Sequence, residues 1–193
     1  MPRKALDNPI VLAVLGLLLE QPAHPYQMLA ELHGRSAHHA AAVTRGTLYN
    51  TVAAMAEAGW LADQGQQRSG NRPERTVYSL TEAGRAELVR RLDQQIRTPE
   101  REFSQFLGAV AYLGALGKSG ALTALAERTD RLAERTAEDE RRLAEVLASG
   151  MPRLFMIEAE YAIAQARSEL AWLHELAEQV ADGRLAWPTS PTG

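Results

Sequence analysis

The order of the periodic patterns in residues 1–97 constrains the fold of this chain most. Three segments carry apolar residues at helical spacing: 10–20, 25–32 and 45–58. Two short segments, 60–67 and 75–80, then follow on either side of a polar turn, and the second alternates and is rich in β-branched and aromatic residues. They predict a β-hairpin. Thr81 can cap a fourth helix that runs to about Arg97. A small helical domain with one hairpin is therefore expected.

Cap residues and prolines divide the rest of the chain. Asn8-Pro9 predicts the start of the first helix, and Thr98-Pro99 predicts another start, where we place a domain boundary. Three further helices are expected, at 99–116, 119–148 and 152–182, with Ser119 capping the second. We expect a mainly α protein with three parts: an N-terminal domain at 1–97, a helical domain at 98–183 and a tail at 184–193.

The long helices of the second half have broad apolar faces that need covering. Leucines and threonines between 122 and 147 trace an approximate heptad pattern. Three helices make a thin unit, so a second chain is the expected partner; a fold in which they cover only each other is the alternative. The residues predicted to form the dimer contact are Leu125, Leu132, Phe155, Tyr161 and Leu176.

Composition and charge exclude several classes of protein. The chain has no cysteine, which excludes disulfides, thiolate metal sites and a cysteine nucleophile and fits a cytoplasmic protein. The longest apolar run has ten residues, about half of a membrane span, and no signal peptide is expected. Residues 1–97 carry 11 basic and 9 acidic side chains, whereas residues 98–193 carry 10 and 15. A polyanionic partner would therefore bind the first half.

No catalytic motif stands out, so we expect neither an enzyme nor a cofactor. Gly117-Lys118-Ser119 is like the end of a phosphate-binding loop, but Tyr112 occupies the position where that motif needs a glycine. His33, His38 and His39 lie close together, and a histidine cluster can bind metal. Their spacing matches no known zinc pattern. Histidines in a solvated loop are the favoured interpretation, and no metal site is predicted.

The hairpin and the helix before it point to DNA. The hairpin carries amide and guanidinium groups suited to phosphate and the minor groove, among them Arg68, Asn71, Arg72 and Arg75. The helix at 45–58 can bury Leu48, Val52 and Met55 and expose polar groups near its start, as a helix in the major groove does. These groups are Arg45, Thr47, Tyr49 and Asn50. Tyr26 can donate to a phosphate. The alternatives are an ordinary polar hairpin and structural packing of Tyr26 and Tyr49.

These elements together predict a winged helix-turn-helix. The sequence also resembles the PadR family of transcriptional regulators over roughly its first half. The motifs that carry the resemblance are VLGLL at 14–18, HPY at 24–26, GTLY at 46–49, GWL at 59–61 and YSLTEAG at 78–84. The family usually has glycine before the tyrosine of HPY, where this chain has Pro25; proline is compatible with a first helical position. The second half resembles the family's dimerisation domain in length and pattern.

The resemblance implies a homodimeric DNA-binding regulator, usually a repressor, that reads a pseudo-palindromic operator. It implies that Thr47, Tyr49 and Asn50 lie on the recognition helix and that Arg68, Arg72 and Arg75 lie on the wing. In related proteins a small aromatic effector can release the DNA. Structural packing is the favoured role for each aromatic candidate in the second half: Phe103, Phe106, Tyr112, Tyr161 and Trp172. The alternative function is a helical adaptor whose winged domain binds a protein.

Overall fold

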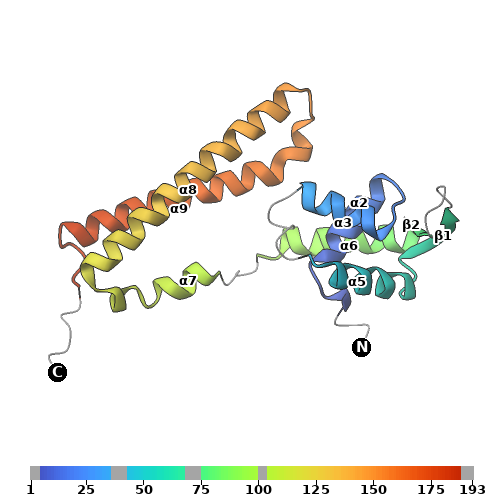
Figure 1. Ribbon diagram of the computed structural model, residues 1–193, viewed down its shortest axis with the longest axis horizontal. Helices are drawn as coiled ribbons and strands as arrows, with labels where there is room; N and C mark the ends of the chain where they lie inside the picture. Colours follow the sequence, from blue (N-terminus) through green and yellow to red (C-terminus); the bar gives the residue numbers. More distant parts are fainter. Residues whose placement is uncertain (1–4, 36–42, 68–74, 100–103, 188–193) are drawn as a thin grey trace. The chain divides into compact units, whose positions relative to one another are not determined.

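The computed structural model describes residues 5–35, 43–67, 75–99 and 104–187 (Figure 1). Contacts along the chain divide it into two units, Met1–Arg101 and Glu102–Gly193, so the division falls four residues after the expected boundary at 97/98. Both units are mainly helical. The expected fold class, a mainly α protein with a winged helix-turn-helix, is confirmed.

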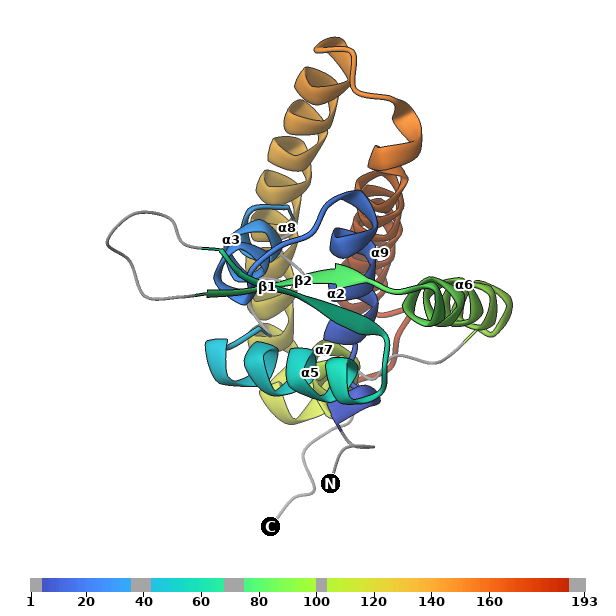
Figure 2. The ribbon, with the colours of Figure 1, turned by 90° about the vertical axis from the view of Figure 1, so that its right-hand side faces the viewer.

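The N-terminal unit has the predicted element order. Its elements are α2 (Ile10–Glu20), α3 (Pro25–Arg35), α5 (Arg45–Glu57), β1 (Leu61–Gln67), β2 (Arg75–Leu80) and α6 (Glu82–Arg97). Pro25 is buried at the first position of α3, where its missing N–H leaves no hydrogen bond unmade. Among the described residues, α2 forms the centre of the core and packs against α3, α5, α6 and β2. Figure 2 shows the hairpin with α5 and α6 around it.

Strands β1 and β2 form an antiparallel hairpin whose pairing runs from Leu61 opposite Leu80 to Gln67 opposite Arg75. A β-bulge interrupts the pairing between Asp63 and Gln66. Gly65 takes a φ of 85° there, and its N–H donates to the Asp63 carboxylate over 2.7 Å. This bulge was not predicted from the sequence, and it bends the strand that leads to the wing tip.

A short bridge ties the linker between α2 and α3 to the hairpin. The Ala23 N–H donates to the Tyr78 carbonyl, and the Tyr78 N–H donates to the Ala23 carbonyl, each over 3.0 Å. The backbone before α3 is therefore fixed to β2.

The C-terminal unit consists of a long helical hairpin with a shorter segment before it. Its elements are α7 (Gln105–Val110), the 3-10 helix η1 (Leu113–Leu116), α8 (Gly117–Ala148), the 3-10 helix η2 (Arg153–Met156) and α9 (Ile157–Ala181). Helices α8 and α9 lie side by side (Figure 1). Leu125, Leu132 and Leu173 are buried between them, with Phe106 and Leu176 packed at the edge of this cluster.

Several predicted helix boundaries are wrong. Thr98 ends α6 by donating its N–H to the Gln94 carbonyl over 3.0 Å, and the next described helix, α7, begins at Gln105. Ser104 caps α7 by accepting from the Leu107 N–H over 3.1 Å. The single helix expected at 99–116 is thus replaced by α7 and η1.

The expected starts of the two long helices are also wrong. Gly117, with a φ of 67°, turns the chain directly from η1 into α8, so Ser119 lies inside the helix and does not cap it. The expected helix at 152–182 begins as η2 and becomes α9 only at Ile157. Asn8 does accept from the Ile10 N–H over 3.0 Å, but α2 starts at Ile10 and not at Pro9. The described part of the chain has no helix of the length and apolar character that a bilayer crossing requires.

Candidate nucleic-acid interface

Helix α5 is anchored by its apolar face and capped at its start. Leu48, Val52 and Met55 are buried in the core of the N-terminal unit. Thr44 has the extended backbone of an N-cap residue, and its hydroxyl accepts from the Thr47 N–H over 3.2 Å. Thr44 is therefore the N-cap residue of α5.

The cap and the buried face together orient the first turns of α5. Arg45 and Asn50 are exposed, whereas Thr47 and Tyr49 are half-buried. The Thr47 hydroxyl lies 2.8 Å from the Thr44 hydroxyl, so these two side chains form part of the cap. The surface of α5 near its start therefore offers a guanidinium, a hydroxyl, a phenol and an amide.

Tyr49 is in contact with two other side chains. Its ring lies edge-to-face with the His24 ring, with 6.5 Å between the centroids. The Arg45 guanidinium lies 5.4 Å from the centroid of the same ring. The Tyr49 ring thus packs against the residue that precedes α3 and against a side chain of its own helix. Sequence reasoning placed Tyr49 on this helix but assigned no role to His24, although the HPY motif contains it.

Tyr26 lies in the first turn of α3, and 56% of its surface is exposed. His24 caps this helix: its Nδ1 accepts from the Tyr26 N–H, and its own N–H donates to the Gln27 side-chain carbonyl, each over 3.0 Å. The two bonds form a reciprocal cap in which histidine takes the place of the usual serine or threonine. The cap presents Tyr26 at the start of the helix that precedes α5.

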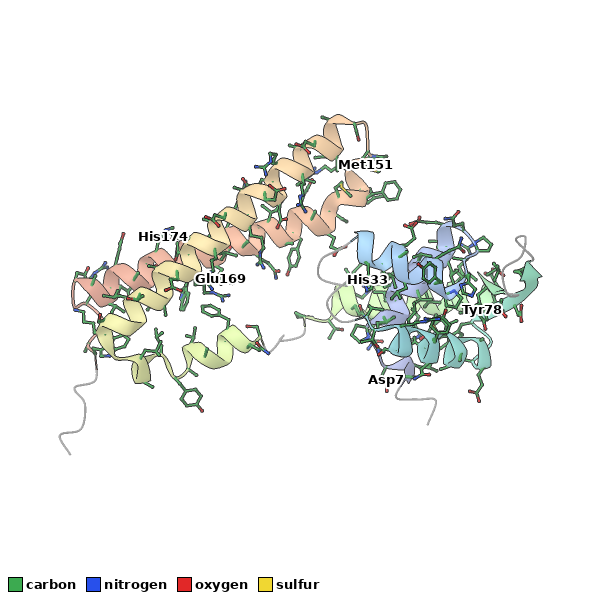
Figure 3. The ribbon with its side chains drawn as sticks, in the orientation of Figure 1. Asp7, His33, Tyr78, Met151, Glu169 and His174 are labelled. Carbon is green, nitrogen blue, oxygen red and sulfur yellow. The ribbon has the colours of Figure 1, made fainter. Side chains whose placement is uncertain are left out.

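The wing residues are only partly within the described structure. Arg68, Asn71 and Arg72 lie outside the described residues, and Arg75 is described only through its backbone, which pairs with Gln67 in the hairpin. Closer to the core, Tyr78 (Figure 3) packs against the apolar cluster of the unit, and the Gln64 amide donates to the Ser79 hydroxyl over 2.6 Å.

Two arginines of α6 are committed to structural contacts. Glu87 accepts from Arg90 and from Arg91, each over 2.7 Å, and the Arg90 guanidinium, helped by that of Arg91, lowers the pKa of the Glu87 carboxyl. Arg91 also donates to the Leu6 carbonyl over 2.8 Å and lies 5.4 Å from the Trp60 ring centroid. This network ties α6 to the N-terminal segment.

The expectation that His33 lies in a loop is wrong, because α3 continues to Arg35 and includes it. The His33 Nε2 donates to the Val43 carbonyl over 3.2 Å. His38 and His39 lie outside the described residues. The part of the chain that the structure describes contains no group of three side chains placed to hold a metal ion.

Two of the five aromatic candidates in the second half lie together, and Phe103 lies outside the described residues. Phe106 and Trp172 pack edge-to-face with centroids 6.1 Å apart, and the Arg128 guanidinium lies 3.5 Å from the Phe106 centroid. Arg128 also donates to Glu169, which is labelled in Figure 3, over 2.7 Å. Tyr112 and Tyr161 are exposed. The structure thus gives Phe106 and Trp172 a packing role and leaves the Tyr112 and Tyr161 side chains largely exposed.

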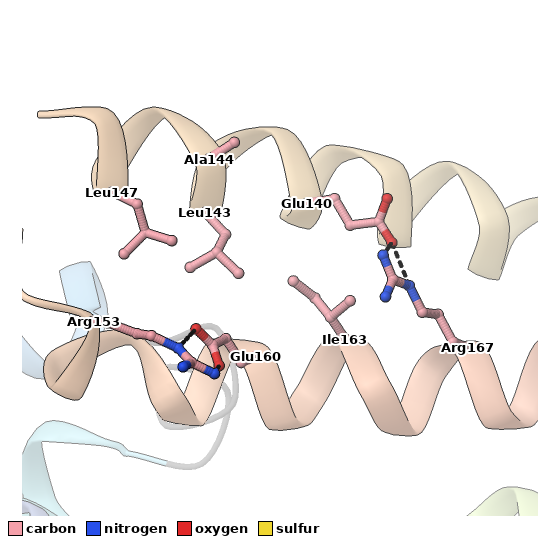
Figure 4. Close-up of a pocket in the computed structure, with 8 residues that line it drawn as sticks. All are labelled: Glu140, Leu143, Ala144, Leu147, Arg153, Glu160, Ile163 and Arg167. Atoms are coloured by element: carbon pink, nitrogen blue, oxygen red, sulfur yellow. Dashed lines mark hydrogen bonds and ion pairs between the residues drawn. The ribbon is translucent and has the colours of Figure 1, made fainter.

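A hollow of about 470 Å³ lies between α8 and α9 near their connection (Figure 4). Leu143, Ala144, Leu147 and Ile163 give it an apolar lining. Two ion pairs border it, Arg153–Glu160 and Arg167–Glu140, each at 2.8 Å. The Arg153 guanidinium lowers the pKa of the Glu160 carboxyl. Because these charges neutralise each other, the hollow is mainly apolar in character.

The residues predicted for the dimer contact fall into two groups. Leu125, Leu132 and Leu176 contribute to the apolar core that α8 and α9 form within a single chain. For these three residues the structure matches the alternative in which the helices cover each other. Phe155 and Tyr161, at the start of the η2–α9 segment, are 66% and 65% exposed.

Comparison with known proteins agrees with this fold. Residues 14–90 match the model of the Transcriptional regulator PadR-like family, a span that contains α5 and the hairpin. A search of curated protein sequences finds no match.

Solved structures of PadR proteins share the fold of the chain. Bacillus subtilis PadR in complex with operator DNA is 17% identical, with a TM-score of 0.74 over 90% of this chain and 99% of the other. The same protein in complex with p-coumaric acid is 16% identical, with a TM-score of 0.69 over 90% and 99%. The PadR-like transcriptional regulator BC1756 from Bacillus cereus is 20% identical, with a TM-score of 0.60 over 90% and 97%.

The family match covers the winged helix-turn-helix, and the structural likeness extends through both units. The family is one of transcriptional regulators and not of enzymes, in line with the expectation from the sequence. Residues 14–90 of this chain are thus similar to the PadR-like family of transcriptional regulators, and solved PadR structures share its fold.

Proposed function

We propose that this protein is a homodimeric cytoplasmic repressor that binds a pseudo-palindromic DNA operator. The observation that carries the proposal is the exposed start of α5. Arg45 and Asn50 project from a helix whose opposite face is buried, and Tyr26 lies exposed on the preceding helix. An amide can form paired hydrogen bonds to adenine, and a guanidinium can do so to guanine.

In this proposal α5, α3 and the wing each contact a different part of the DNA. Helix α5 enters the major groove with Arg45, Thr47, Tyr49 and Asn50. Tyr26 contacts the DNA backbone. The wing residues Arg68, Asn71, Arg72 and Arg75 contact phosphate or the minor groove, where counterion release favours arginine. Two such units would read half-sites about one helical turn apart.

We further propose that a small aromatic effector releases the DNA. The complex of Bacillus subtilis PadR with p-coumaric acid supports this class of ligand. Because Phe106 already packs on Trp172 and on Arg128, an effector at Phe106 would have to open these contacts.

The alternative is an adaptor whose winged domain binds a protein. The modest excess of basic over acidic residues in 1–97 and the overall pI near 6.0 favour it. The two functions differ in their dependence on salt, because only DNA binding releases condensed counterions in proportion to the phosphates contacted.

The experiment is selection of a duplex from random-sequence DNA by the full chain, followed by fluorescence-anisotropy titration of the selected and a shuffled duplex at several salt concentrations. We expect Asn50→Ala to reduce the preference for the selected duplex by about 5-fold to 100-fold. The change of Arg68 and Arg72 to Ala should weaken binding to both duplexes and reduce the salt slope by about 0.9 for each phosphate that is no longer neutralised.

Gln95→Ala is the matched control, because it removes an exposed amide from α6 outside the proposed interface. It should leave both affinities unchanged. Adding p-coumaric acid to the complex tests effector release directly. Failure to enrich any duplex, or binding that does not respond to salt, would favour the adaptor.

A further inference from the structure

His24 lies where three elements of the N-terminal unit meet. The residue before it, Ala23, is fixed to β2 by two backbone hydrogen bonds with Tyr78. His24 itself caps α3 through its Nδ1 and its backbone N–H. Its ring contacts Tyr49 on α5. One side chain thus connects the strand that leads to the wing, the helix that carries Tyr26 and the recognition helix.

The two functions of the His24 side chain use different parts of the imidazole. The cap needs only an acceptor at the position of Nδ1. The contact with Tyr49 needs an aromatic ring of suitable size, because edge-to-face pairs depend on the quadrupoles of both rings. Since Nδ1 accepts, the proton of the neutral imidazole resides on Nε2.

A half-buried tyrosine on a DNA-facing helix needs such a constraint. Tyr49 has two rotatable side-chain bonds, and its hydroxyl moves by several ångströms when they change. Ordering it only on binding would reduce the gain from any contact it makes. His24 and Arg45 restrict its ring before DNA arrives.

We propose that His24 is a positioning residue for DNA recognition: it holds Tyr49 in the orientation that discriminates between sequences, while it caps the helix that presents Tyr26. The inference rests on the proposed function, because it names a residue that tunes the same interface. His24 acts through Tyr49 and need not contact the DNA itself.

Three substitutions separate positioning from folding. His24→Asn retains a cap acceptor, because asparagine is a favoured N-cap residue, but removes the ring. His24→Phe retains a ring but removes the acceptor. His24→Ala removes both. The matched control is His174→Asn, the same change at an exposed position on α9 (Figure 3).

The measurements are thermal unfolding and the ratio of affinities for the selected and shuffled duplexes, on the full chain. We expect His24→Asn to keep its Tm within about 2 °C of the parent, since a cap remains. The ratio of its affinity for the selected duplex to that for the shuffled duplex should fall about 5-fold to 10-fold. This is the lower part of the range of discrimination that one contact to a base provides. His24→Phe should show the reverse: a Tm lower by a few degrees and a ratio within about twofold of the parent.

The decisive test is a double-mutant cycle with Tyr49→Leu. If His24 acts through Tyr49, His24→Asn should change the ratio less than about twofold in the Tyr49→Leu background. An unchanged ratio for His24→Asn in the parent, or the same fall in both backgrounds, would overturn the inference while the proposed function stands. If the parent selects no duplex at all, the proposed function fails, and this inference fails with it.

Discussion

A missing side chain at position 84 allows α6 to begin against the backbone of Trp60. A Cβ on Gly84 would lie 2.2 Å from the Trp60 carbonyl oxygen and 2.8 Å from the Leu80 Cδ1. The same junction is closed by Thr81, whose hydroxyl donates to the Gly59 carbonyl over 2.7 Å and accepts from the Gly84 N–H over 3.0 Å. The end of α5, the wing strand β2 and the start of α6 are thereby joined at one point.

We predict that Gly84→Ala lowers the free energy of unfolding by about 1–3 kcal/mol, because the backbone carbonyl that meets the new methyl group cannot move aside cheaply. Gly46→Ala is the control: a Cβ there meets nothing within 4 Å, and alanine favours a helix by up to about 1 kcal/mol. Urea unfolding followed by circular dichroism measures both. An equal loss of unfolding free energy in Gly84→Ala and Gly46→Ala would show that the close approach to Trp60 does not cause the destabilisation.

At the residue scale, sequence patterns predicted the positions along α5 but not the contacts between helices. The apolar spacing of Leu48, Val52 and Met55 predicted which face is buried, and this is confirmed. The role of His24 could not be predicted, because its ring meets Tyr49 only through the packing of α3 beside α5. A contact between residues far apart in sequence leaves no periodic signal.

At the scale of elements, the capped starts of α5 and α6 were predicted correctly, whereas the capped start of α7 at Ser104 and the backbone turn into α8 were not. Thr44 and Thr81 accept from the N–H groups of Thr47 and Gly84, as their sequence context predicts. The start of α8 depends instead on the positive φ of Gly117. The bulge at Gly65 is of the same kind. A glycine shows that such a conformation is possible, but not where the chain uses it.

Helix α6 supplies a prediction about pH. Glu87 accepts from Arg90 and Arg91 while its side chain is only 14% exposed, and the Arg90 guanidinium lowers its pKa in the folded state. A lowered folded-state pKa contributes stability above the ordinary carboxyl pKa of 4.5, and this contribution is lost as the pH falls through the folded-state value. The free energy of unfolding of the parent should therefore exceed that of Glu87→Gln by about 1–3 kcal/mol near pH 7, and this difference should shrink below about pH 4.

Unfolding free energies between pH 3 and pH 8 test this prediction. Asp93→Asn is the matched control on the same helix, because the Asp93–Arg97 pair is exposed on both sides and should contribute less than about 0.5 kcal/mol. A Glu87→Gln deficit that stays constant across the pH range would mean that the carboxylate's charge is not responsible.

At the scale of the whole molecule, the apolar pattern of the long helices had two interpretations. The structure accounts for part of that pattern within one protomer, because Leu125 and Leu132 are buried against Leu173. The spacing of leucines along α8 is the same whether the partner helix belongs to the same chain or to another. Only exposure in the folded unit separates the two cases, and it directs the dimer proposal to Phe155 and Tyr161.

We predict that the double change of Phe155 and Tyr161 to Glu weakens self-association of the full chain at least tenfold, because it places two carboxylates on a surface that a dimer would desolvate. Sedimentation velocity over a range of protein concentrations measures this association. Leu116→Glu, a change at another exposed apolar position in the same unit, should leave self-association unchanged.

Since a dimer binds two half-sites together, the double variant should also lose affinity for the selected duplex while the unfolding of its N-terminal unit is unaffected. A parent protein that sediments as a monomer, or a double variant that sediments like the parent, would remove these two residues from the interface.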